Sequence, residues 1–185
     1  MGIDNFKWDD QDRSVSWLYN GKHITKKYDN AYFASLNSEK QYVVVEAGQN
    51  YSPDLIFYLS FEGKQIFNLD KVNDKISWQL QDHLIQVNCK NILNAQIYPE
   101  QGVAIVISKE NQFEKVLKGY AMDGTLLFVK HPPQGFDFSY LSTLKNQPSV
   151  VCEGDEDHTD VYGRSGWSFI IDTKTGDMTK GNLAY

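Results

Sequence analysis

The densest group of reactive side chains in the sequence lies near its C-terminal end, between Glu153 and Gly166. Within eight positions this stretch carries one histidine and five acidic residues, namely Glu153, Asp155, Glu156, Asp157, His158 and Asp160. Carboxylates at this density could bind a calcium ion or meet the basic groups of a partner. They could also form a solvated acidic loop without a ligand, and the three interpretations compete.

The calcium interpretation rests on oxygen ligands at alternate positions. Asp155, Asp157 and Thr159 follow the spacing of a calcium loop, but Asp160 replaces the turn glycine and Gly166 stands where the bidentate glutamate belongs. A calcium-stabilised structural protein is therefore kept as an alternative, and no metal ligands and no cofactor are predicted.

The partner-binding interpretation adds the neighbouring side chains of the same loop. Tyrosine, tryptophan and arginine are the residue types that most often anchor protein interfaces. Tyr162, Arg164 and Trp167 all lie within seven positions after Asp160. The predicted partner-binding residues are Glu153, Asp155, Glu156, Asp157, Asp160, Tyr162 and Arg164.

Motifs for catalysis are weak by comparison. Gly163-Arg-Ser165-Gly166 lacks the full nucleophile-elbow pattern, and the four histidines are scattered singly, without the spacing of a zinc site. The phosphate-binding and dinucleotide-binding glycine motifs are also absent from the sequence. Paired carboxylates for glycoside hydrolysis stay open, because the fold sets their separation. We expect no catalytic residues and favour a non-enzyme, with a carbohydrate-binding or carbohydrate-active domain as the alternative.

Charge bears on the kind of partner. The 185 residues carry a formal net charge of -6 and an isoelectric point near 5.2, which argues against sequence-independent nucleic-acid binding. An acidic surface more naturally meets a basic protein. The leading hypothesis is a non-catalytic interaction module, in one form an immunity-type inhibitor that masks a basic toxin or enzyme. Neither a secretory signal nor a membrane span is evident, so a cytoplasmic protein is expected.

An internal repeat predicts the fold that carries this loop. Residues 15–69 align without a gap to residues 76–130, 61 positions later, with about ten identical pairs that include Trp17/Trp78, Val45/Val106 and Gly63/Gly124. A degenerate third copy covers 136–181. We predict one all-β antiparallel domain over 1–185.

Hairpins are the best-defined part of each copy. Glu62-Gly63 and Asp123-Gly124 separate apolar, β-rich runs, and Asn20-Gly21 fits a type I′ turn. A further turn is predicted at 38–40. An apolar strand, a turn with an acidic residue and glycine, and a second apolar strand resemble the last two strands of a blade in quinoprotein-like and related β-propellers. Asp172-Thr-Lys-Thr-Gly176 is the closest match.

The resemblance implies propeller-like hairpins, and a two-sheet β-sandwich is the alternative architecture. Open sheet edges would have to be covered by charge or by self-association. The repeated Trp17 and Trp78 are predicted to fill the core, and Cys89 and Cys152 to be buried free thiols.

Overall fold

The protein is described here by a computed structural model, which covers residues 2–38 and 40–184. The strands of the described chain form four sheets, and every strand pairing within them is antiparallel. Three short 3-10 helices lie between strands. The predicted all-β antiparallel fold is confirmed, and its hairpin-built sheets fit propeller-like hairpins as well as sandwich hairpins. The turn predicted at 38–40 includes Glu39, which lies outside the described residues.

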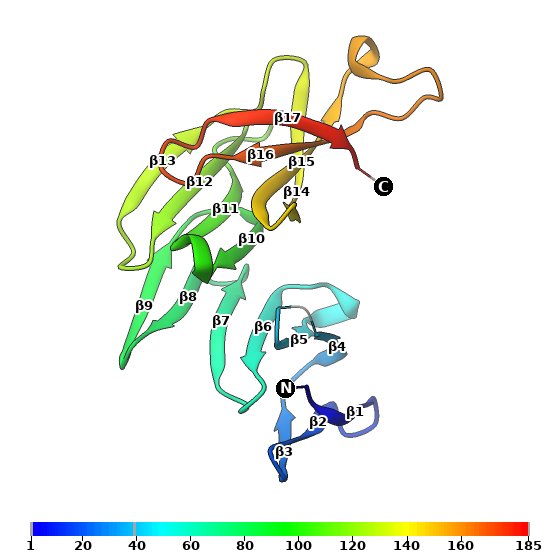
Figure 1. Cartoon of the computed structure of the whole chain (residues 1–185), viewed down its shortest axis with the longest axis vertical. Helices are drawn as coiled ribbons and strands as arrows, with labels where there is room; N and C mark the ends of the chain where they lie inside the picture. Colours follow the sequence, from blue (N-terminus) through cyan, green and yellow to red (C-terminus); the bar gives the residue numbers. More distant parts are fainter. Residues whose placement is uncertain (1, 39, 185) are drawn as a thin grey trace. The chain divides into compact units, whose positions relative to one another are not determined.

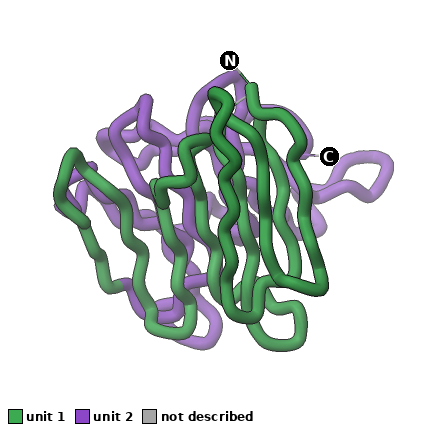
Figure 2. Tube along the Cα trace, turned by 90° about the horizontal axis from the view of Figure 1, so that it is seen from below, with its two compact units in different colours: residues 1–88 green, residues 89–185 purple. Residues whose placement is uncertain are grey.

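The chain forms two compact units, coloured separately in Figure 2, of which the first is Met1–Asn88. Its sheets have the orders β1-β2-β3 and β4-β5-β6-β7-β8-β9. The strands are β1 (Asp4–Asp9), β2 (Ser14–Tyr19), β3 (Lys22–Lys27), β4 (Ala31–Asn37), β5 (Tyr42–Ala47), β6 (Leu55–Ser60), β7 (Gln65–Asp70), β8 (Lys75–Leu80) and β9 (His83–Asn88), with helix η1 (Gln49–Tyr51) between β5 and β6.

The second unit is Cys89–Tyr185, and it holds two four-stranded sheets of simple up-and-down order. Figure 1 shows these strands in green to red. They are β10 (Ile92–Tyr98), β11 (Val103–Lys109), β12 (Lys115–Ala121), β13 (Leu126–Lys130), β14 (Phe136–Leu144), β15 (Gln147–Gly154), β16 (Gly166–Ile171) and β17 (Met178–Leu183), with helices η2 (Pro99–Gln101) and η3 (Glu156–His158). The prediction of a single domain stays a prediction.

Strand positions recur in the two stretches that the sequence aligned. Strand β2 begins at Ser14 and β8 at Lys75, and β3 and β9 begin at Lys22 and His83, each pair 61 positions apart. The β-branched runs that suggested buried strands lie on β5 and β11. A shared origin of the two stretches stays a prediction.

The core of the first unit is built around Trp17. This side chain is fully buried, and its indole Nε1 donates a hydrogen bond to the carbonyl oxygen of Phe61 at 2.7 Å. Trp78 is also buried, and the two tryptophans face Ile24 and Ile85 at the same place in their hairpins. The prediction that both tryptophans fill the core is confirmed.

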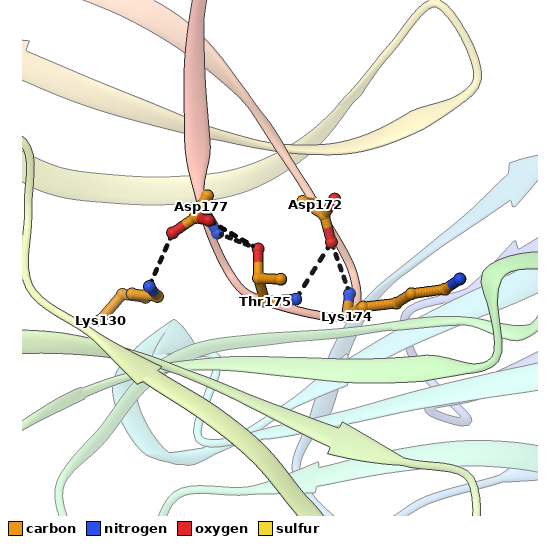
Figure 3. A network of polar contacts seen from close by, with 5 residues as sticks. All are labelled: Lys130, Asp172, Lys174, Thr175 and Asp177. Carbon is orange, nitrogen blue, oxygen red and sulfur yellow. Dashed lines mark hydrogen bonds and ion pairs between the residues drawn. The ribbon is translucent and has the colours of Figure 1, made fainter.

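The core of the second unit joins its two sheets through Phe128 on β13. A Cβ atom built on Gly119 or on Gly176 would clash with the Phe128 ring, so both glycines leave room for it. Gly176 lies in the β16–β17 turn, and Lys130 of β13 forms an ion pair of 2.7 Å with Asp177 in the same turn (Figure 3). The Asp172 carboxylate accepts hydrogen bonds from the backbone N–H groups of Lys174 and Thr175 (Figure 3). The turn that resembles a propeller hairpin is thus packed against the neighbouring sheet.

Several local features of the fold also agree with the sequence. Asn20 and Gly21 both have positive φ, 48° and 73°, as a type I′ turn requires. Near the N-terminus, Asp4–Asp9 forms strand β1, which pairs with β2. Cys89 and Cys152 are free and buried, as predicted. In the described part of the chain, none of the helices has the length and apolar character to cross a membrane.

Candidate functional site

The acidic loop of the sequence, residues 155–165, connects β15 to β16. The last paired residues of the two strands are Glu153 and Gly166, and in Figure 1 the loop, in orange, projects beyond the ends of both strands. Its first part is helix η3 and its tip is a turn at 161–163. The hairpin therefore places the loop where a second molecule can reach it.

Asp160 and Arg164 hold the tip of this loop in shape. The Oδ2 atom of Asp160 lies 2.7 Å from Nε and 2.6 Å from Nη2 of Arg164. Its Oδ1 atom accepts the backbone N–H groups of Tyr162 and Arg164 at 2.8 and 2.9 Å. These contacts with Arg164, together with the N–H donors, lower the pKa of Asp160 from its ordinary value. Asp160 therefore organises the loop, and its carboxylate is occupied.

His158 ties the base of the loop to the sheet. Its Nδ1 atom lies 2.5 Å from Oδ1 of Asp155, and its ring lies 4.4 Å from that of Phe136 on β14. The hydrogen bond from His158 lowers the pKa of Asp155. The indole Nε1 of Trp167 donates to the carbonyl oxygen of His158 at 2.9 Å, and the Lys180 ammonium lies 3.7 Å from the centroid of that indole. The loop is thus attached at its base by contacts with β14 and β16.

The carboxylates that the sequence grouped together divide into two sets. Glu153 accepts a hydrogen bond from Ser165 at 2.8 Å, so with Asp155 and Asp160 it is used inside the loop. Glu156 and Asp157 are exposed, and their carboxylates form no hydrogen bond or ion pair with the rest of the described chain. Among the described carboxylates of the loop, these two are left for an external cation or hydrogen-bond donor.

The tip of the loop presents apolar surface. Val161 is 93% exposed and Tyr162 is 80% exposed, while the guanidinium carbon of Arg164 lies 5.3 Å from the centre of the Tyr162 ring. Val161 was not singled out in the sequence, because a single valine in a polar loop carries no signal. Among the residues that the structure describes, no group of three histidine, cysteine or acidic side chains is placed to hold a metal ion.

A second feature, in the first unit, was not predicted. An open cleft of about 520 Å³ lies where the β1–β2, β3–β4 and β5–β6 connections meet. A smaller one of about 340 Å³, which also touches the β7–β8 turn, shares Asn30, Gly48 and Gln49 with it. The larger cleft is lined by Asp10, Arg13, Asn30, Ala31, Tyr32, Gly48, Gln49, Asn50 and Tyr51, and the smaller one adds Asp54, Leu55 and Val72.

The β5–β6 loop forms one wall of this cleft. A Cβ atom on Gly48 would overlap the carbonyl oxygen of Ser52, so only glycine lets the loop fold back this closely. Asn50 and Tyr51 then have positive φ values of 53° and 60°, which are strained for a bulky residue. This backbone leaves Tyr51 79% exposed, with its ring 5.7 Å from that of Tyr32.

Hydrogen bonds within the fold fix the side chains of Tyr32 and Arg13 at the cleft. The Tyr32 hydroxyl donates to Oε2 of Glu46 at 2.9 Å, and burial together with this bond raises the pKa of Tyr32 to about 12. Arg13 donates to Oδ1 of Asn30 at 3.3 Å. Lys71 follows β7, and its backbone N–H donates to the backbone carbonyl oxygen of Asp54. Burial lowers the pKa of the Lys71 side chain. Sequence spacing did not indicate this site, because its residues come from four separate turns.

Comparison with known proteins bears on the fold alone. No family model matches the chain, and no curated protein matches it. Among solved structures, the chain is similar to a dihydro-heme d1 dehydrogenase, NirN, in complex with DHE, with 10% identity and a TM-score of 0.50 over 92% of this chain and 43% of that one. It also matches a functionally unknown protein from Desulfotomaculum acetoxidans, with 9% identity and a TM-score of 0.42 over 97% and 50% of the two chains. The chain thus spans about half the length of these structures.

Proposed function

We propose that this chain is a non-catalytic protein-binding module that contacts its partner through the projecting loop 155–165. One observation carries the proposal. The tip exposes Val161 and Tyr162 almost completely, at 93% and 80%, while the backbone beneath them is fixed by the Asp160 carboxylate. Exposing apolar side chains to water is unfavourable in free energy, and a partner surface that covers this ordered tip would remove that cost.

Rigidity supports binding because it removes an entropic cost. A loop that is ordered before association loses little conformational freedom when it docks. Here Arg164 closes the tip, and the Trp167 bond to His158 fixes the base. Tyr162 then resembles an interface anchor, a large aromatic group with a polar end that can fill a pocket of the partner.

Charge supports a basic partner. Glu156 and Asp157 are the loop carboxylates left unpaired among the described residues, and the whole chain carries a net charge of -6. A basic surface would be attracted over a distance of about 8 to 10 Å at ordinary ionic strength, which would speed association. The specific form of the proposal is an immunity-type inhibitor that covers a basic toxin or enzyme.

Affinity capture with matched variants tests this function. Wild-type protein, the double variant Val161→Ser/Tyr162→Ala and the control Phe113→Ala are immobilised and exposed to extract from the native host. Phe113 is a fair control because it is 94% exposed but lies on the β11–β12 loop. We expect a basic protein that the wild type and Phe113→Ala retain, that the double variant loses, and whose activity falls when wild type is added. Equal capture by the double variant would refute the loop as the binding surface.

Salt and charge variants separate the two parts of the proposal. Glu156→Gln/Asp157→Asn should slow association at low salt and change dissociation little, because unpaired rim charges act mainly on the encounter. If this variant associates as fast as wild type at every salt concentration, the partner is not recognised through its basic charge.

A further inference from the structure

We infer that the cleft of the first unit binds an uncharged saccharide, with Tyr51 as its aromatic platform and the amides of Asn30, Gln49 and Asn50 as its polar contacts. The site lies in a different unit of the chain from loop 155–165 and does not depend on the protein-binding function.

The conformation of Tyr51 is the first argument. Two successive non-glycine residues, Asn50 and Tyr51, lie in the left-handed region, where a bulky side chain is strained. In return Asn50 and Tyr51 hold a tyrosine ring at the cleft, 79% exposed, at 77° to the ring of Tyr32. Burial does not account for this position, because the ring is largely exposed and packs within the fold through an edge contact with Tyr32. An aromatic face in an open polar cleft suits the C–H face of a sugar ring.

The polar lining of the cleft also suits a sugar. Each sugar hydroxyl both donates and accepts hydrogen bonds, so a site for sugars needs donors and acceptors side by side. The amides of Asn30, Gln49 and Asn50 each offer one acceptor oxygen and two donors, and Arg13 adds further donors. A few such groups around an aromatic ring are enough to orient a ligand.

Charge decides against an ionic ligand. The two clefts are lined by the charged residues Asp10, Asp54 and Arg13, and Glu46 and Lys71 lie close enough to interact electrostatically. Arg13 already donates to Asn30, and Asp54 accepts a hydrogen bond from Ser52 at 2.7 Å. No excess of cations faces the cleft to bind a phosphate. The carboxylates of Asp54 and Glu46 already accept hydrogen bonds from Ser52 and Tyr32, so they are not left to bind an ammonium group.

Size indicates more than one sugar unit. The main cleft, at about 520 Å³, lies within the usual range of about 300 to 1,000 Å³ for small-molecule sites. The second hollow, beside Val72 and Leu55, shares its lining at Asn30 and Gly48. A short oligosaccharide would cover both, with its apolar edge on Val72, which is 71% exposed.

A glycan array and an NMR titration test the assignment. The intact chain is applied to an array of neutral oligosaccharides, and ¹⁵N-labelled protein is then titrated with maltotriose, cellotriose and tri-N-acetylchitotriose. We expect at least one of these probes to shift amide signals of 10–13, 30–32 and 48–54. Tyr51→Ala should weaken that binding about tenfold, which corresponds to one good aromatic contact.

The controls make the result specific to the cleft. Phe113→Ala removes an even more exposed aromatic side chain from the second unit and should bind as wild type does. Tyr51→Phe keeps the ring and should retain most of the affinity, which separates stacking from loss of the loop's shape. The inference is overturned by a silent array with no shift from the three probes, by unchanged binding in Tyr51→Ala, or by shifts in the cleft caused by inorganic phosphate and not by sugar.

Discussion

Both Nε and Nη2 of Arg164 lie within 2.7 Å of the same oxygen of Asp160, and the other oxygen of that carboxylate holds the backbone of the loop tip. Two of the seven residues predicted to bind a partner are therefore bound to each other. Their role is to shape the loop, and the exposed side chains between them make the surface.

The planar guanidinium of Arg164 should be needed for this shape. Arg164→Lys keeps the charge but loses the fixed arrangement of donors around Asp160. We expect faster backbone motion at 161–163 in ¹⁵N relaxation, with the melting temperature nearly unchanged. Lys64→Ala removes an exposed pair of 3.6 Å with Glu62 and serves as the control. Unchanged relaxation in Arg164→Lys would show that the loop is held by its backbone alone.

Acid should loosen the same loop. The folded-state pKa of Asp155 and of Asp160 is lowered from the ordinary 3.8. A lowered pKa means that each carboxylate contributes its full stabilisation above pH 3.8 and loses it as the pH falls through the folded-state value. Carboxyl carbon shifts should give titration midpoints below 3.8 for both residues, and loop motion should rise over the same range. In Asp160→Asn the tip should already be mobile at neutral pH.

Trp17 should contribute to stability through its hydrogen bond as well as its size. Trp17→Phe leaves the Phe61 carbonyl oxygen buried without its donor, which costs about 1 to 3 kcal/mol, and the smaller ring adds a cavity. Urea unfolding should show this loss. Trp8→Phe is the control, because Trp8 is only half-buried and should tolerate the change better. An equal loss in both variants would contradict the assigned hydrogen bond.

The Phe128 ring should make Gly119 irreplaceable. Gly119→Ala forces a methyl group into the ring and should cost about 1 to 3 kcal/mol of unfolding free energy by overpacking. The smaller side chain of Phe128→Leu should relieve that cost, so the double variant should lose less than the sum of the two single variants. Additive losses in a double-mutant cycle would mean that the clash is absorbed elsewhere.

Alkaline pH should destabilise the fold through its tyrosines. Burial raises the folded-state pKa above 10.0 for Tyr28, Tyr32, Tyr42, Tyr58 and Tyr120. A raised pKa gives stabilisation that is complete below pH 10 and is lost as the pH rises through the folded-state values, which for Tyr32 is about 12. An absorbance titration of the native protein should show part of the eleven tyrosines ionising only above the usual pH. A single transition near pH 10 would contradict this.

Much of the fold follows from local chemistry. Alternating and β-branched runs such as Tyr42 to Val45 predict strands because their side chains fit a pleated, buried surface, and Asn20-Gly21 predicts a tight turn because both residues accept positive φ. The acidic stretch was located correctly as a loop for the same kind of reason, since its polar residues cannot fill a core.

The strands, the turns and the position of the acidic loop follow from the order of residues, because each depends on neighbours in the chain. The pairing of Asp160 and Glu153, and the lack of a partner for Glu156 and Asp157 among the described residues, follow from the way the folded loop closes on itself. The cleft of the first unit could not be predicted from the sequence. Arg13, Asn30, Tyr51 and Asp54 come together only because antiparallel strands return the chain to the same end of the unit, and no spacing along the sequence records that distance.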